Sequence, residues 1–118
     1  MAKVLVVDDS PSIRALISGL LESMGHIPLL AEDGQKALEL ANAETVDLIV
    51  TDLNMPRLGG IGLITALRSR RKYASTPILV LTTELALQKA AMQAGATGFG
   101  VKPLDEGRFR KAIDRLIG

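Results

Sequence analysis

The chain has 118 residues, of which 47% are hydrophobic and 23% charged, and its formal net charge is +1. This length and composition favour one compact domain with a real core and exclude a disordered segment. The nearly neutral charge gives no reason to expect binding to nucleic acid or to a membrane surface. The absence of cysteine excludes disulfides and thiolate metal sites and fits a reducing compartment. The apolar runs are too short for a signal peptide or a membrane span, so we expect a cytoplasmic protein.

Short apolar runs alternate along the chain with segments of helical periodicity. The runs have the length of strands, several are rich in β-branched residues, and turn residues bound them. They lie at residues 3–7, 27–31, 46–50, 77–81 and 97–101. Each run is therefore predicted to form a strand.

The first helical segment follows the first run. Its apolar residues recur at helical spacing from Ile13 to Met24 and predict one apolar stripe. Ser10 is a natural N-cap, and Pro11 suits the first helical position. Gly25 is expected to end the helix.

The second and third helices follow the second and third runs. Asp33 is expected to cap a helix that extends to about Asn42. The third helix is predicted from near Leu58 to Ser69. Its first turn contains several glycines, which we expect to loosen it. These glycines are Gly59, Gly60 and Gly62.

The fourth helix is predicted from about Glu84 to Ala94, with its end at Gly95. The last helix is expected to be capped by Asp105. Its apolar residues share one face of the helix. They are Phe109, Ala112, Ile113 and Leu116.

Strict alternation of strands and helices indicates an α/β fold, a doubly wound parallel sheet with helices on both faces. The pattern alone leaves the order of the strands open. In such sheets, ligands bind at the carboxyl ends of the strands. The residues that follow the predicted strands are therefore the first candidates for a functional site.

Polar residues follow four of the predicted strands, and a parallel sheet would gather them on one edge. They are Asp8 and Asp9, Thr51 and Asp52, Thr82 and Thr83, and Lys102 with Pro103. Carboxylates about 4–6 Å apart repel each other by roughly 3–4 kcal/mol per pair at an effective dielectric constant near 20, which favours a bound cation. Oxygen ligands without nearby histidine or cysteine favour Mg²⁺.

The chemistry of these residues indicates phosphoryl transfer. Asp52 is a carboxylate that can act as a nucleophile and form an acyl phosphate. A divalent cation and Lys102 would neutralise the transferring group, and Thr82 offers a hydroxyl beside it.

With these motifs in place, the sequence resembles the receiver domains of response regulators in two-component signalling, most closely the stand-alone chemotaxis (CheY-like) type. The segments that carry the resemblance are VLVVDDS, DLIVTDLNMP, ILVLTT and AGATGFGVKP, and together they cover nearly the whole chain. The resemblance implies a single receiver domain over residues 1–118. It also implies a five-stranded flavodoxin-like (βα)5 fold with the strand order 2-1-3-4-5.

The resemblance implies a role for each residue at the strand ends. Asp52 would accept a phosphoryl group from the phosphohistidine of a histidine kinase. Asp9, Asp52 and the backbone carbonyl of Asn54 would bind Mg²⁺, and Asp8 would act through a water molecule. Lys102 would contact a phosphate oxygen.

The resemblance also implies a conformational switch. Thr82 would hydrogen-bond the phosphoryl group, and Phe99 would turn inward as Thr82 moves. Asn54 and Glu84 occupy positions that tune self-dephosphorylation in this family. The chain would then catalyse only its own phosphoryl uptake and loss. As a monomer it would bind an output protein through the fourth helix, the fifth strand and the last helix.

Several residues depart from the family pattern. Gly59 stands where an aspartate is common, Phe99 where a tyrosine is frequent, and Leu104 where a phenylalanine is frequent. Gly100 thins the fifth strand. The segment 82–95 is shorter than usual, which predicts a truncated fourth helix or a truncated loop before it.

Three alternatives compete with a stand-alone receiver domain. The residues could be a receiver from a longer regulator. A haloacid dehalogenase-type aspartyl-phosphate hydrolase expects a second carboxylate two residues after the nucleophile, where this chain has Asn54. A flavodoxin-like flavin carrier needs a hydroxyl- and glycine-rich loop after the first strand to bind phosphate, but residues 8–12 read DDSPS and are acidic there. The chain also has no tryptophan to stack on the flavin ring.

Basic residues occur at 68–72 and along the last helix, where Arg108, Arg110, Lys111 and Arg115 lie. With only three aromatic residues in the chain, we interpret these positions as a solvated face, or as contacts for an acidic partner, rather than as a nucleic-acid site. His26 is interpreted as a surface or capping residue rather than a metal ligand.

Overall fold

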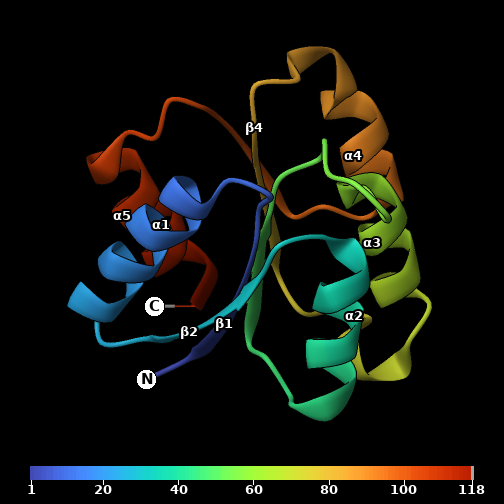
Figure 1. Cartoon of the computed structure of the whole chain (residues 1–118), viewed down its shortest axis with the longest axis horizontal. Coiled ribbons are helices and arrows are strands. Elements are labelled where there is room, and N and C mark those ends of the chain that lie inside the picture. Colours follow the sequence, from blue (N-terminus) through green and yellow to red (C-terminus); the bar gives the residue numbers. More distant parts are fainter. Residues whose placement is uncertain (118) are drawn as a thin grey trace.

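The computed structural model describes residues 1–117 and places a parallel sheet between two layers of helices (Figure 1). The strands are β1 (Lys3–Val7), β2 (Ile27–Ala31), β3 (Leu48–Thr51), β4 (Ile78–Thr82) and β5 (Gly98–Val101). Their order in the sheet is β2-β1-β3-β4-β5. This order confirms the flavodoxin-like α/β fold that the resemblance implied. The predicted strands differ from those observed by at most two residues at either end.

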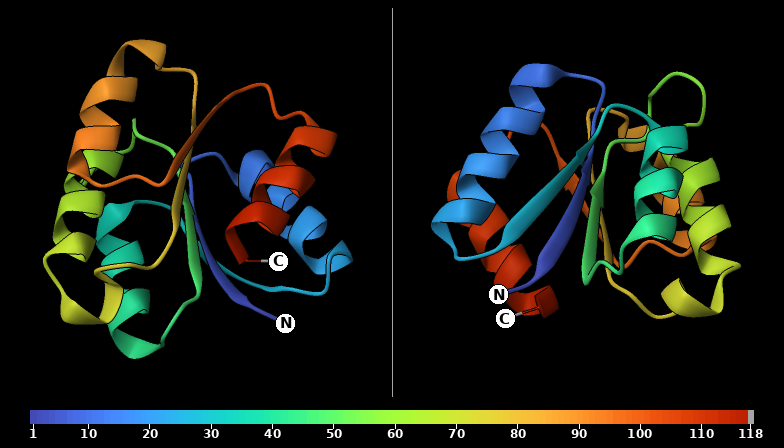
Figure 2. Two further views of the ribbon diagram at one scale, coloured as in Figure 1. Left: turned by 180° about the vertical axis from the view of Figure 1, so that it is seen from behind. Right: turned by 60° about the horizontal axis from the view of Figure 1, so that its bottom comes forward.

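The helices cover both faces of the sheet. They are α1 (Pro11–Ser23), α2 (Gly34–Ala43), α3 (Gly60–Arg68), α4 (Gln88–Ala94) and α5 (Glu106–Ile117), with short 3₁₀ turns at η1 (Arg71–Tyr73) and η2 (Leu85–Leu87). Helices α1 and α5 cover one face, and α2, α3 and α4 cover the other (Figures 1 and 2). The sheet therefore has a separate apolar core on each side.

Three N-caps lie where the sequence predicts them. The side chains of Ser10, Asp33 and Asp105 each accept a hydrogen bond from the amide three residues later, at 3.3, 2.9 and 2.9 Å. Each bond satisfies one of the amides that lack a partner in the first turn of a helix. These local signals fix where α1, α2 and α5 begin at the sheet edge.

Helix α3 begins at Gly60, two residues later than the predicted start at Leu58. The Gly60 amide donates to the carbonyl oxygen of Leu53 at 2.9 Å. A Cβ atom on Gly60 would lie 2.2 Å from the carbonyl oxygen of Asp52, so only glycine permits this approach. At this position the glycine allows the helix start to lie against the end of β3.

Helix α4 begins at Gln88 and not at Glu84 as predicted, and its α-helical part has only seven residues. The turn before it, η2, is 3₁₀, and Glu84 makes no side-chain cap there. Leu85 is 58% exposed, so little packing stabilises this turn. Leu16 also departs from its prediction, because it is 48% exposed although it belongs to the apolar stripe of α1.

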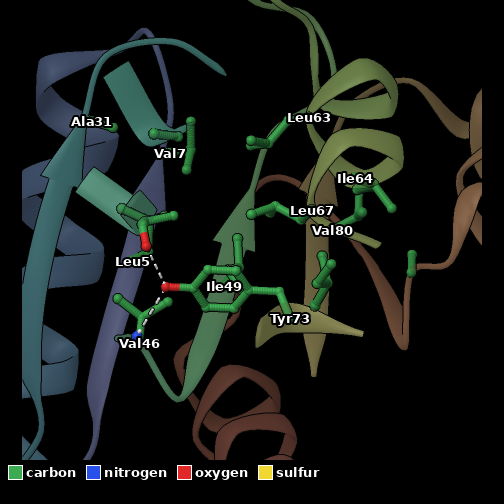
Figure 3. Close-up of a cluster of buried hydrophobic side chains, with 14 of the residues drawn as sticks. Leu5, Val7, Ala31, Val46, Ile49, Leu63, Ile64, Leu67, Tyr73 and Val80 are labelled. Carbon is green, nitrogen blue, oxygen red and sulfur yellow. Dashed lines mark hydrogen bonds between the residues drawn. The ribbon is translucent and has the colours of Figure 1, made fainter. Parts of the chain in front are cut away.

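The core under α2 and α3 contains the largest buried side chain, Tyr73 (Figure 3). Its hydroxyl oxygen lies 2.7 Å from the carbonyl oxygen of Ala41 and 2.8 Å from that of Glu44. The amide of Val46 donates to the same hydroxyl at 3.4 Å. These bonds join the end of α2 to the start of β3, at the amino-terminal edge of the sheet. Within residues 1–117, no helix has the length and apolar character needed to cross a membrane.

Candidate functional site

The register of the sheet places Asp8 beside Asp52. Val7 and Thr51 are paired residues at the ends of β1 and β3, so the next residue on each strand lies at the same level. The amide of Asp52 donates to the carbonyl oxygen of Val7 at 2.9 Å and continues the ladder one step further. The two carboxylates therefore meet at the carboxyl edge of the sheet, as the sequence predicts.

Asp8, Asp9 and Asp52 form an acidic cluster. One carboxylate oxygen from each residue lies within 4.8 Å of those of the other two. Asp8 is 2% exposed and Asp52 is 9% exposed, whereas Asp9 is exposed to solvent. Because burial weakens screening by water, the two buried carboxylates repel each other strongly unless a cation lies nearby.

Lys102 supplies one such cation. Thr82 pairs with Val101 at the end of β4 and β5, so the next residue of the chain, Lys102, reaches the same edge. Its Nζ donates to Oδ2 of Asp8 at 2.6 Å and to Oδ2 of Asp52 at 3.0 Å. Burial by itself lowers the pKa of Lys102, but the hydrogen bonds and charges of these two carboxylates outweigh burial and raise its pKa. The lysine therefore stays protonated between the two acids.

Backbone amides fix the other oxygens of the two buried carboxylates. The amide of Leu53 donates to Oδ1 of Asp52 at 2.7 Å, and the amide of Ser10 donates to Oδ1 of Asp8 at 2.9 Å. Arg14 adds a contact that the sequence analysis missed, because its Nη1 donates to the carbonyl oxygen of Asp8 at 2.6 Å. Its position one turn after the predicted N-cap was the only available signal.

The donor set of the cluster fits a hard divalent cation. Three carboxylates face a single lysine ammonium, so the site keeps an excess of negative charge. The ligands are all oxygen atoms, with no histidine or cysteine among them. Mg²⁺ is commonly held in this way, by one or two carboxylates together with water and phosphate oxygens.

The other predicted site residues surround this cluster at different depths. Thr82 is fully buried, and its hydroxyl oxygen accepts a hydrogen bond from the amide of Glu84 at 3.1 Å. Phe99 is half-buried and packs against the core on the α2–α4 side. Asn54 is exposed, two residues after Asp52. Within residues 1–117, no hydrogen bond joins the Thr82 hydroxyl to the acidic cluster.

Known proteins of one family match both the sequence and the fold. The sequence model of the response regulator receiver domain family matches residues 4–114 of this chain. A chemotaxis protein CheY homolog of Campylobacter jejuni is 35% identical, over 98% of this chain and 92% of that protein. The structure of the chemotaxis response regulator CheY4 of Vibrio cholerae is 40% identical, with a TM-score of 0.94 over 99% of each chain.

A further solved structure is that of the receiver domain of a sensor histidine kinase from Pseudomonas aeruginosa. It is 28% identical, with a TM-score of 0.91 over 99% of this chain and 98% of that one, and it holds a magnesium ion coordinated in the active site cleft. The chain therefore belongs to the response regulator receiver domain family and is a CheY-type receiver of two-component signalling.

Proposed function

We propose that Asp52 accepts a phosphoryl group from the phosphohistidine of a histidine kinase. A carboxylate oxygen of Asp52 attacks the phosphorus, the P–N bond breaks, and the imidazole nitrogen keeps the electron pair and takes up a proton. Water later cleaves the acyl phosphate and releases phosphate. The chain catalyses only these two steps of its own phosphorylation cycle. The observation that carries the proposal is the acidic cluster with Lys102 between its two buried members.

The residues of the site divide the work. Asp9, Asp52 and the backbone carbonyl of Asn54 would hold Mg²⁺, and Asp8 would contribute through a water molecule. When bound, Mg²⁺ neutralises charge on the phosphoryl oxygens. Lys102 stays protonated and turns from Asp52 to a phosphoryl oxygen as the acyl phosphate forms.

Two residues, one exposed and one half-buried, are proposed to set the lifetime of the acyl phosphate. Asn54 is exposed two residues after Asp52, and Glu84 is half-buried two residues after Thr82, where its amide donates to the Thr82 hydroxyl. Both side chains can reach the region through which a water molecule approaches the acyl phosphate. We expect a short-lived phosphorylated form.

Labelling with a small acyl phosphate tests this function. With Mg²⁺ present, the chain should gain one phosphoryl group that alkali and hydroxylamine remove, and mass spectrometry should place it on Asp52. Asp52→Asn should abolish the label, because an amide is not a nucleophile. Asp47→Asn is the matched control, since Asp47 lies at the opposite edge of the sheet, where its carboxylate accepts from the Lys3 amide. A label that persists in Asp52→Asn would reject the assignment.

We further propose that an output protein binds the face formed by α4, β5 and α5. A cavity of about 330 Å³ lies between β4, β5 and α5, with Leu81, Gly100 and Phe109 in its walls and Arg108 beside them. Exposed apolar side chains also lie on η2, α4 and β5. They are Leu85, Leu87, Met92 and Val101. The chemistry suits a partner that inserts an apolar side chain and places acidic groups near α5.

The proposed switch connects the site to this face. When the phosphoryl group draws the Thr82 hydroxyl away from the Glu84 amide, space opens that the half-buried ring of Phe99 can enter. A partner can bias the two states only by its different affinity for them, so the phosphorylated form should bind more tightly. NMR shifts on adding beryllofluoride and Mg²⁺ test this step. Large changes confined to α1 and the Asp52 loop, with none around Phe99, would refute it.

We propose that the chain acts in the cytoplasm as a monomer and as one receiver domain over residues 1–118. Its histidine-kinase donor and its output protein would then meet a single globular surface. Light scattering of the phosphorylated chain tests the oligomeric state, and the measured mass should be that of one chain, 12.5 kDa.

A further inference from the structure

The loop that follows Asp52 is held by a residue that the proposed chemistry does not use. Residues 53–59 connect β3 to α3 and include Asn54, whose backbone carbonyl is proposed to bind the cation. Arg57 lies near the end of this loop with φ of 65°. It is the one non-glycine residue with positive φ in the part of the chain that the structure describes. Such a backbone is disfavoured for arginine, so something else must stabilise it.

The Arg57 guanidinium reaches across to the start of α2. Its Nε donates to Oδ2 of Asp33 at 2.7 Å, and its Nη2 binds the same oxygen. The Nη2 also donates to Oε1 of Glu32 at 3.3 Å. The Asp33 side chain is 1% exposed, and its other oxygen caps α2. Burying a carboxylate costs free energy unless the carboxylate is paired, and Arg57 provides that pairing. Because Asp33 is also held by the start of α2, it offers Arg57 an acceptor in a fixed position.

Backbone contacts join the same two loops. The amide of Gly34 donates to the carbonyl oxygen of Leu58 at 3.0 Å. A Cβ atom on Gly34 would lie 2.4 Å from that oxygen, so a larger residue would separate the loops. Two contacts therefore join the loops: the side chains of Asp33 and Arg57 form an ion pair, and the backbones of Gly34 and Leu58 form a hydrogen bond.

These contacts between the two loops matter for the position of the loop after Asp52, because α3 begins without a side-chain cap. Gly59 is the N-cap residue of α3 and offers no side chain to its first amides. At the other end, the Leu53 amide ties the loop to Asp52. The far end of the loop therefore depends on the contacts of Arg57 and Leu58 with the α2 start, and on the Gly60–Leu53 hydrogen bond.

We infer that Arg57 is a positioning residue: its ion pair with Asp33 fixes the loop after the phosphoacceptor and so holds the Asn54 carbonyl in place for the cation. The inference rests on the proposed function, because it assigns the loop the role of a ligand. Arg57 itself touches neither the cation nor the phosphoryl group. Its effect should therefore be smaller than the roughly 10–100-fold loss that follows removal of a group hydrogen-bonded directly to a metal ligand.

Three variants separate the ion pair from the backbone. Arg57→Gly removes the guanidinium and suits a positive φ, so it cuts the pair without adding strain. Asp33→Ser keeps an N-cap for α2 but is too short to reach Arg57. Arg57→Lys keeps the charge but loses the planar fork of donors. We expect the dissociation constant for Mg²⁺ to rise roughly three- to tenfold in Arg57→Gly and in Asp33→Ser, with Arg57→Lys between wild type and Arg57→Gly.

The probe is Mg²⁺ alone, followed by NMR titration of the whole chain without a phosphodonor. Hydrogen exchange of the Gly34 amide gives a second readout, and it should become faster in Arg57→Gly because its acceptor lies in the released loop. The double variant should bind Mg²⁺ no more weakly than either single variant, since both cut one contact.

Tyr73→Phe is the control for a general loss of stability. It removes buried hydrogen bonds at the amino-terminal edge of the sheet, far along α2 from the Arg57 contact. It should destabilise the fold and leave the dissociation constant for Mg²⁺ unchanged. The inference would be overturned if Arg57→Gly kept the wild-type dissociation constant for Mg²⁺. It would also be overturned if Tyr73→Phe raised that constant as much as Arg57→Gly does. If Asp52 is not labelled in wild type, the proposed function fails, whereas these Mg²⁺ constants still decide the role of Arg57.

Discussion

Two clusters of carboxylates stand at the same edge of the sheet, each with one basic side chain. In the first, Lys102 lies between Asp8 and Asp52, and its side chain is 15% exposed. In the second, Arg57 binds Asp33 and Glu32 with a side chain that is 62% exposed. Both oxygens of Asp33 are used by hydrogen bonds. Each cluster has more acids than bases, so charge count alone does not tell a site from a structural contact.

The difference lies in where the excess charge points. In the first cluster the oxygens of three carboxylates converge within 4.8 Å, and within residues 1–117 no hydrogen bond occupies Asp9. In the second, the extra acid, Glu32, is 63% exposed and lies in water beside its partner. Convergence of carboxylate oxygens, two of them from buried residues, therefore distinguishes the proposed cation site from the second cluster.

The largest expected effect is on the first cluster. Lys102→Ala leaves Asp8 and Asp52 facing each other, so the free energy of unfolding should fall by roughly 2–3 kcal/mol, below the about 3–5 kcal/mol for breaking a fully buried pair. Mg²⁺ should restore more stability to this variant than to wild type, because it replaces the lost charge. Urea unfolding with and without Mg²⁺ measures both. Lys111→Ala, which removes an exposed lysine of α5, should stay within about 0.5 kcal/mol of wild type.

A smaller effect, of opposite sign, is expected at the exposed member of the same cluster. Asp9→Ala removes one of three like charges, so without Mg²⁺ the free energy of unfolding should rise by about 1 kcal/mol. Mg²⁺ binding should weaken in the same variant. Asp114→Ala makes the same change of charge on the exposed side of α5 and is the control. A less stable Asp9→Ala chain in the absence of Mg²⁺ would contradict the picture of uncompensated repulsion.

The smallest effect concerns the second cluster and its dependence on pH. The hydrogen bond from the Lys36 amide, aided by Arg57 and opposed by burial, lowers the pKa of Asp33 below its ordinary value of 3.8. A lowered pKa in the folded state means that ionised Asp33 stabilises the fold above pH 3.8, and that this stability is lost as the pH falls through the folded pKa. The stability gap between wild type and Asp33→Ser should therefore narrow in acid.

Urea midpoints of the two proteins at neutral pH and well below pH 3.8 measure this gap. Glu32→Gln changes a neighbouring acid that is exposed and should leave the acid dependence close to that of wild type. A stability difference between wild type and Asp33→Ser that does not change with pH would show that the charge of Asp33 does not contribute to folding stability.

Sequence patterns predicted the first cluster but not the second. Asp8, Asp52 and Lys102 could be brought together because parallel strands end on one edge, a rule that needs only the positions of the strands. Asp33 was recognised only as a helix cap, since that role depends on the amide three residues away. Its pairing with Arg57 joins residues 24 positions apart, and no local pattern encodes it.

The errors at the helix starts have the same origin. The caps at Ser10 and Asp105 were correct because each is satisfied within its own turn. The start of α3 was wrong because it depends on the fit of Gly60 against the Asp52 carbonyl, a contact between two elements. Local chemistry therefore predicted the elements and the acidic site, while packing between loops decided how the site is held.

We propose that the first cluster binds a second cation and that the second cluster does not. An NMR titration of the wild-type chain with Mg²⁺ tests this difference. The amides of Asp8, Asp9 and Asp52 should shift and saturate together, while those of Glu32 and Asp33 change little. Equal shifts at both clusters, or shifts at the first that never saturate, would contradict the claim.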